Sequence, residues 1–81
     1  MSYILAIDSG NSFIKWGLFN HGCCLKLGKI QYDKIQDVKN DFKDLQAPES
    51  IIISHVSREA TKNQICEQIS RWPVKPHWIR S

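Results

Sequence analysis

Between residues 6 and 16 the chain brings together an aspartate, a glycine, small polar side chains and a lysine, in the string Ala-Ile-Asp-Ser-Gly-Asn-Ser-Phe-Ile-Lys-Trp. Asp8 is a candidate oxygen ligand for a hydrated Mg²⁺. Gly10 can adopt a positive φ and, lacking a Cβ, lets an anion approach the backbone. The amides of such a turn can form an anion-binding nest, and Lys15 would add a positive charge beside it. Without a ligand the same residues make an ordinary hairpin turn, and the turn residues alone favour that simpler interpretation.

Composition limits the classes of protein to consider. With 81 residues the chain is at most one small domain, and its 42% hydrophobic and 23% charged residues suffice for a core. The formal net charge is +3, but the basic residues are scattered, so we expect no nucleic-acid partner. The N-terminus lacks the pattern of a signal peptide and no apolar run could span a membrane, so we expect a soluble, cytoplasmic protein with no membrane partner.

The cysteines and histidines show no metal-site spacing. They are Cys23, Cys24, Cys66, His21, His55 and His77. We expect free thiols in a reducing compartment. His21 is interpreted as a solvent-facing turn residue. His55 follows a predicted strand, where ligands often bind in open α/β sheets, but a lone histidine there is more simply a structural loop residue.

Hydrophobic patterning predicts a strand-rich first half followed by alternating helices and strands. The predicted elements are strands at 3–7, 13–19 and 23–30, a helix from Asp33 to before Pro48, a strand at 51–53, a helix from Ser57 to before Pro73, and a strand from Pro76. The run 3–7 is apolar throughout, which favours a central strand covered on both faces. Lys26 and Lys29 favour a position near the sheet edge for their strand.

Each predicted helix carries one apolar stripe and a candidate N-cap. In the first, Asp33 is the expected N-cap and the stripe consists of Ile35, Val38, Phe42 and Leu45. In the second, Ser57 is the expected N-cap and the stripe consists of Ile65, Ile69 and Trp72. The order β-β-β-α-β-α-β predicts an α/β protein with a mixed sheet and helices packed on its faces, in which the strand 51–53 runs parallel to the first.

This order, with Asp-x-Gly-Asn-Ser in the first hairpin, resembles the N-terminal lobe of the ribonuclease-H-like (actin-like ATPase) fold. The string from Ile7 to Trp16 is similar to the opening of the type III pantothenate kinases, also called the Bvg accessory factor family. There, an Asp-x-Gly-Asn-Thr/Ser turn followed by a lysine is the first phosphate-binding motif, and Ser12 stands here for the commoner threonine. The segments 51–57 and 78–81 are similar in layout, so the resemblance spans the chain, but only the first string is specific.

The resemblance implies an ATP-dependent kinase that phosphorylates pantothenate, the first step of coenzyme A biosynthesis. It implies an ATP-binding and phosphate-binding segment made of Asp8, Ser9, Gly10, Asn11, Ser12, Phe13, Ile14 and Lys15. Asp8 would organise Mg²⁺ through water, the amides of the turn would hold phosphate oxygens, and Lys15 would offset their charge. A monovalent cation, K⁺ or NH₄⁺, and a homodimer are implied for the full-length enzyme.

The resemblance assigns no catalytic residue to this chain, because the family's catalytic aspartate is expected beyond Ser81. We therefore expect residues 1–81 to be a single, truncated N-terminal lobe that is inactive alone. Two other functions stay open. A ribonuclease-H-like nuclease fragment would use Asp8 as a two-metal ligand, but the other acidic residues fall on predicted helix surfaces or loops. A non-catalytic regulatory or accessory module would show no response to nucleotide at the turn.

Overall fold

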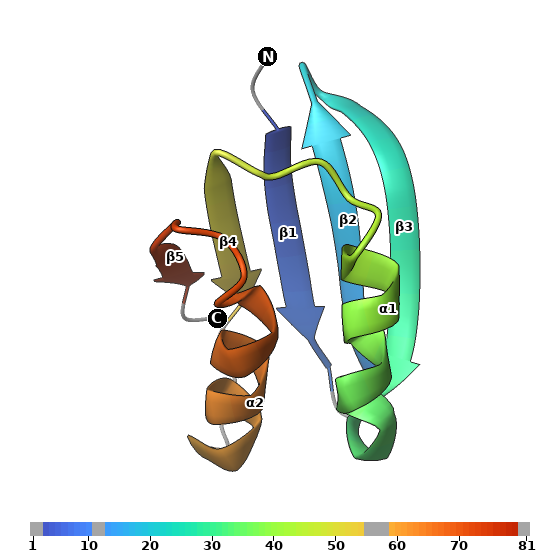
Figure 1. Ribbon diagram of the computed structural model, residues 1–81, viewed down its shortest axis with the longest axis vertical. Helices are drawn as coiled ribbons and strands as arrows, with labels where there is room; N and C mark the ends of the chain where they lie inside the picture. Colours follow the sequence, from blue (N-terminus) through green and yellow to red (C-terminus); the bar gives the residue numbers. More distant parts are fainter. Residues whose placement is uncertain (1–2, 11–12, 55–58, 80–81) are drawn as a thin grey trace.

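A computed structural model describes residues 3–10, 13–54 and 59–79. They form a five-stranded sheet accompanied by helical segments (Figure 1). The strands are β1 (Tyr3–Ser9), β2 (Phe13–Asn20), β3 (Cys23–Gln31), β4 (Ser50–Ser54) and β5 (Pro76–Ile79). The helical segments are the 3₁₀ helix η1 (Tyr32–Asp37), α1 (Val38–Phe42) and α2 (Glu59–Ile69). The predicted order of elements is confirmed.

The sheet is mixed and its strand order is β3-β2-β1-β4-β5. Strands β1, β2 and β3 form an antiparallel meander, whereas β4 pairs with β1, and β5 with β4, in parallel. The prediction that 51–53 runs parallel to the first strand is confirmed, and β3 lies at a sheet edge as its lysines indicate. His21 and Gly22 close the β2–β3 hairpin with φ values of 53° and 78°, as a two-residue turn requires.

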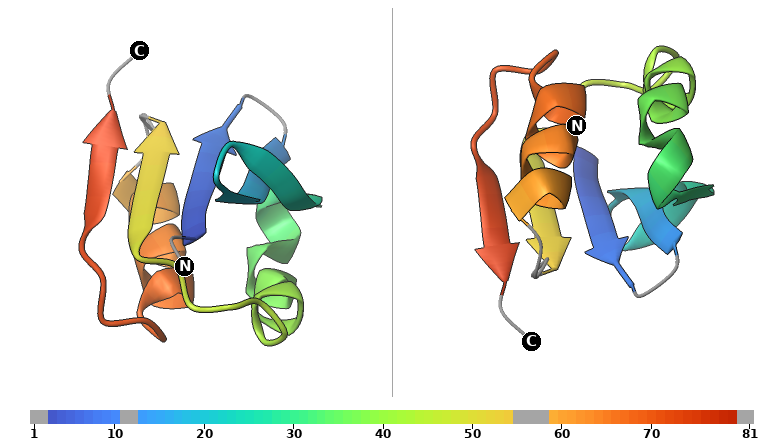
Figure 2. Two further views of the ribbon diagram at one scale, coloured as in Figure 1. Left: turned by 90° about the horizontal axis from the view of Figure 1, so that it is seen from above. Right: turned by 90° about the horizontal axis from the view of Figure 1, so that it is seen from below.

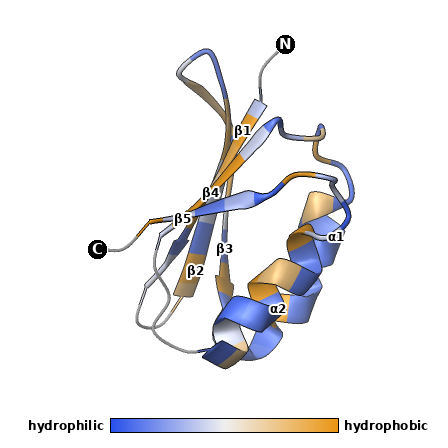
Figure 3. Ribbon diagram, turned by 90° about the vertical axis from the view of Figure 1, so that its left-hand side faces the viewer, coloured by the Kyte–Doolittle hydropathy of each residue, from blue (hydrophilic) through white to orange (hydrophobic). Residues whose placement is uncertain are grey.

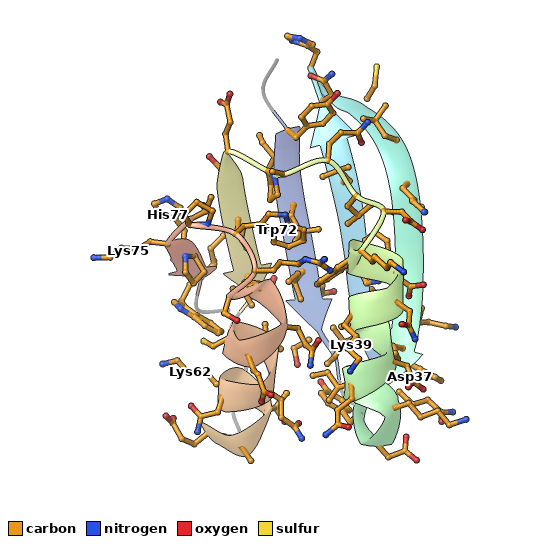
Figure 4. All side chains as sticks on the ribbon, in the orientation of Figure 1. Asp37, Lys39, Lys62, Trp72, Lys75 and His77 are labelled. Atoms are coloured by element: carbon orange, nitrogen blue, oxygen red, sulfur yellow. The ribbon has the colours of Figure 1, made fainter. Side chains whose placement is uncertain are left out.

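The core lies on one face of the sheet. Its buried members are Leu5, Ile7, Ile14, Trp16, Leu18, Ile35, Val38, Phe42, Ile51, Ile53, Ile65, Ile69 and Trp72. On the strands these residues alternate with the ones facing the other side, as the two-residue period of a strand demands. The helices α1 and α2 both cover this face of the sheet (Figures 2 and 3). Trp72 lies between the two helices, over the sheet (Figure 4).

The opposite face of the sheet has no helix over it within the described residues (Figure 3). Ile4 on the central strand is 38% exposed and Leu27 on β3 is 72% exposed. The fold class is as expected, but the expectation that residues 3–7 form a strand covered on both faces is wrong for the described chain. An apolar run shows that a strand can be buried on two sides, not that both sides are covered.

The first helix differs in detail from its prediction. Its N-cap is Gln31, without a side-chain capping bond, and the chain then passes through η1, which is kinked at Lys34 (φ −118°, ψ 22°). Asp33 therefore lies inside the 3₁₀ segment and is not the N-cap. The stripe is nevertheless confirmed, because its first three members are buried and Leu45 packs against the core at its edge. Over six residues, apolar spacing cannot distinguish a 3₁₀ turn from an α-helix.

The second helix follows its prediction where the structure describes it. Ile65 and Ile69 are buried on α2, Trp72 is buried just after it, and Pro73 follows before β5. The predicted N-cap Ser57 and the candidate His55 lie outside the described residues. Across the described ranges, neither α1 nor α2 has the length and apolarity that crossing a membrane would take.

Candidate functional site

The turn between β1 and β2 is closed through its glycine. The Gly10 N–H donates to the Phe13 carbonyl oxygen at 3.0 Å. A Cβ added at Gly10 would lie 3.3 Å from that same oxygen, which is a tight contact. Two of the residues implicated in phosphate binding, Asn11 and Ser12, lie outside the described residues. In this conformation the Gly10 amide closes the turn and is not free to bind a phosphate oxygen.

Beside the turn, charged side chains form a row across three strands. Asp8 on β1 is paired in register with Lys15 on β2, and Lys15 is paired with Lys29 on β3. Paired residues in antiparallel strands project from the same face, with Cβ atoms about 4.5–5.5 Å apart. All three are exposed. On the other side of Asp8, Ser54 ends β4 one residue after Ile53, which pairs with Ile7.

This charged row borders a shallow hollow of about 550 Å³ on the uncovered face of the sheet. The floor of the hollow is apolar, and its residues come from four neighbouring strands: Ala6, Gly17, Phe19, Leu27 and Ile52. The rim includes Asp8, Lys15, Lys29 and Ser54. With two lysines and one aspartate, the row carries a net positive charge, which favours an anionic group at this end of the hollow.

Lys29 is a member of the row that the sequence did not single out as a site residue. Its Nζ lies 4.5 Å from the centroid of the Phe13 ring. This cation–π contact keeps the ammonium near the end of the turn. Phe13, predicted to contact phosphate, thus acts in the structure as a support for Lys29. Lys29 can be identified from the pairing of β2 with β3, which sets it opposite Lys15, but a sequence pattern does not supply that register.

The residues next to Asp8 and Lys15 project to the other face of the sheet. Ile14 is 3% exposed and its side chain is in the core, so only its backbone is available to a ligand. The Ser9 hydroxyl lies 2.5 Å from the Tyr32 hydroxyl, which in turn donates to the Gly10 carbonyl oxygen. Ser9 is thus engaged within the protein, and Tyr32 is a second residue at the turn that sequence reasoning missed.

The remaining candidates for chemistry lie apart from this row. Cys23 and Cys24 are exposed free thiols at the far end of β3, and Cys66 is a half-buried free thiol on α2, as expected. His21 is exposed in the second turn, as predicted, and His77 is exposed on the edge strand β5 near Lys75 (Figure 4). Within the described ranges, no three His, Cys, Asp or Glu side chains are grouped as a metal site would need.

The fold is shared with a solved structure. A chain of T. thermophilus RuvC in complex with a Holliday junction substrate superposes with a TM-score of 0.53 over 96% of this chain and 65% of that chain. Only 10% of the aligned residues are identical. At this identity the likeness concerns the fold alone, and it supports the ribonuclease-H-like architecture expected from the element order.

Similarity in sequence is more specific. The proteins named type III pantothenate kinase from Nitrosospira multiformis and Nitrosomonas eutropha are 35% and 37% identical to this chain over 77 and 79 residues. These alignments cover 94% and 96% of this chain but only 29% and 31% of the relatives, so the chain spans about a third of their length. The family model described as type III pantothenate kinase matches residues 4–81. This chain therefore belongs to the type III pantothenate kinase family.

Proposed function

We propose that this chain is the ATP-phosphate-binding lobe of a pantothenate kinase, which transfers a phosphoryl group from ATP to pantothenate. The observation that carries the proposal is the pairing of Asp8 with Lys15 directly beside a glycine-closed hairpin turn. An aspartate and a lysine on adjacent strands, next to a turn that an anion can approach, are the parts that phosphoryl transfer needs. Catalysis of that reaction depends mostly on positioning and on neutralising charge.

Each charged residue has a distinct part in this proposal. Lys15 and Lys29 would offset the charge of the phosphates from one side of Asp8. Gly10 is proposed to let the anion approach because it has no Cβ, while its own N–H holds the turn closed against the Phe13 carbonyl oxygen, which a Cβ at residue 10 would crowd. The amides of Asn11 and Ser12 remain the proposed donors to phosphate oxygens. The lobe would thus bind and orient the triphosphate, and the catalytic base is proposed to lie in a part of the enzyme beyond these residues.

Magnesium fits the residues present. Mg²⁺ in nucleotide sites is commonly held by one or two carboxylates, several waters and the phosphates themselves. Asp8 supplies one exposed carboxylate at the end of β1, next to Ser54 at the end of β4. A hydrated ion bound to that carboxylate would neutralise phosphate charge where Lys15 also acts. The monovalent cation and the homodimer are proposals for a longer polypeptide of the family.

The ribonuclease-H-like fold raises the alternative of a nuclease, and the carboxylates argue against it. A two-metal nuclease needs several acidic ligands around two ions about 3.5–4 Å apart. Asp8 is the one carboxylate that lines the hollow, and the structure over residues 3–10, 13–54 and 59–79 groups no three potential ligands. A row of one aspartate with two lysines supports binding of a nucleoside triphosphate with one hydrated metal ion.

A chimera tests the activity. Residues 4–81 replace the corresponding segment of the Nitrosospira multiformis relative, and ATP-dependent phosphorylation of pantothenate is measured in a coupled assay. We expect the chimera to be active and Asp8→Asn in the same chimera to lower kcat/KM at least a hundredfold. Lys26→Gln, on β3 but outside the row, is the matched control. A chimera that is folded by circular dichroism yet transfers no phosphate would contradict the proposal.

A further inference from the structure

Tyr32 lies beside the Asp8 turn although 22 residues separate it from Gly10. It follows β3 directly, and because Gln31 pairs with Phe13, the chain leaves β3 level with the start of β2. The Tyr32 ring is partly buried and packs against the core. Its hydroxyl is therefore carried by a ring that the core holds in place, and it meets the turn from the helix-covered side of the sheet.

The hydrogen bonds around this hydroxyl have a defined direction. A carbonyl oxygen can only accept, so the single proton of the Tyr32 hydroxyl goes to the Gly10 carbonyl. The Ser9 hydroxyl, 2.5 Å from the Tyr32 oxygen, must then be the donor in that pair. The result is a chain of two bonds, from Ser9 to Tyr32 and from Tyr32 to Gly10. It links the side chain of one turn residue to the backbone of the next.

Gly10 is thereby tied at both of its backbone polar groups. Its N–H is bonded to Phe13 and its carbonyl to Tyr32. Glycine is the residue with the widest choice of φ and ψ, and it loses the most freedom when a ligand orders it. Because a peptide unit is planar, holding the carbonyl oxygen also holds the plane of the peptide unit to which it belongs. The most flexible residue of the turn is thus ordered before any ligand arrives.

We propose that Tyr32 is a positioning residue for triphosphate binding: its hydroxyl pre-orders the peptide plane of Gly10 through the Ser9–Tyr32–Gly10 hydrogen bonds. This inference rests on the proposed function, and it assigns no contact between Tyr32 and the nucleotide. A glycine ordered in advance loses less entropy when a ligand binds, so the hydroxyl raises affinity without touching the ligand. The same contact couples the start of η1 to the turn between β1 and β2.

The test compares Tyr32→Phe with Tyr3→Phe. The second variant also removes a phenolic hydroxyl, but at the end of β1 opposite to the turn. For each labelled chain, Mg-ATP affinity is measured by calorimetry, and the ¹³C shift of the Gly10 carbonyl and the exchange rate of the Gly10 N–H are measured without nucleotide. Urea unfolding of the same samples separates a global loss of stability from a local effect. We expect Tyr32→Phe to weaken Mg-ATP binding about three- to tenfold, to move the Gly10 carbonyl shift and to speed exchange. Tyr3→Phe should do none of these.

The outcomes separate this inference from the proposed function. If Tyr32→Phe binds Mg-ATP as tightly as the unchanged chain, or leaves the Gly10 carbonyl shift in place, Tyr32 does not position the turn, and the proposed function stands. If the unchanged chain itself does not bind Mg-ATP, the proposed function is wrong and the role of Tyr32 in it is overturned as well. Ser9→Ala, which removes only the outer bond, should show the same changes at a smaller size.

Discussion

Replacing Gly28 with alanine should destabilise the chain through a single buried contact. Gly28 on β3 pairs with Trp16 on β2, and the indole ring lies across the glycine. A Cβ at residue 28 would lie 2.2 Å from Trp16 Cε2 and 2.4 Å from both Cζ2 and Nε1. These separations are far inside van der Waals contact, so either the ring or the strand must move.

The ring has little room to move. Trp16 is 4% exposed and meets Phe42 edge-on, with centroids 5.3 Å apart and planes at 81°. Phe42 is in turn packed against Trp72 at 5.4 Å. Overpacking of a filled core costs about 1–3 kcal/mol of stability. This cost exceeds the stability that alanine gains over glycine inside a strand, which is about 0.5–1 kcal/mol. We expect Gly28→Ala to lower the free energy of unfolding by roughly 2 kcal/mol and Tm by about 8–16 °C.

Urea and thermal unfolding followed by far-ultraviolet circular dichroism measure both quantities. The matched control is Gly28→Ala in a Trp16→Leu background, where the ring that causes the overlap is absent. There the second change should be close to neutral, which gives a coupling free energy of about 2 kcal/mol between the two sites. If Gly28→Ala stays within about 0.5 kcal/mol of the unchanged chain, or if its cost persists without the ring, overlap with a fixed Trp16 ring is not the cause of the destabilisation.

Two further predictions concern the faces of the sheet and the charged row. Leu5 is fully buried, whereas Leu27 is 72% exposed. In urea titrations Leu5→Ala should therefore lower the free energy of unfolding by about 2–5 kcal/mol, and Leu27→Ala should lower it by at most about 0.5 kcal/mol. Equal costs would mean that the second face of the sheet is covered too. Lys29→Gln should weaken Mg-ATP binding about two- to fivefold at low salt, with the loss shrinking as salt rises, whereas Lys26→Gln, outside the row, should have no effect in the same calorimetric titration. Equal losses from the two lysine variants would show that only the overall charge of β3 matters.

Much of the fold can be predicted from the sequence because its signals are local. The apolar runs predict the strands, the second hairpin has its turn residues, and the stripe from Ile35 to Phe42 predicts a buried helical face. Two structural details escape such signals. The 3₁₀ geometry around Lys34 leaves the spacing of the stripe almost unchanged. The uncovered face beside Ile4 depends on which side of the sheet both helices occupy, and strand periodicity carries no information about that.

Part of the candidate site can also be predicted from the sequence, because some of its residues are close together along the chain. Asp8, Gly10 and Lys15 are within eight residues of one another, so a short motif can reveal them. Lys29 and Tyr32 join them only through the β2–β3 register and the exit of the chain from β3. Their partners are more than ten residues away in sequence. Such contacts follow from tertiary structure, and no pattern of residue types announces them.

The phosphate-binding role of the turn is tested most directly by titrating Mg-ATP into the ¹⁵N-labelled chain and following its backbone amide shifts. We expect the amides from Gly10 to Lys15 to move first and to saturate together, with those near Lys29 and Tyr32 moving less. Asp8→Asn should weaken the response, because the hydrated Mg²⁺ loses its carboxylate. If the amides of the turn stay still at millimolar nucleotide while distant ones move, the turn is a plain hairpin and ATP binds elsewhere.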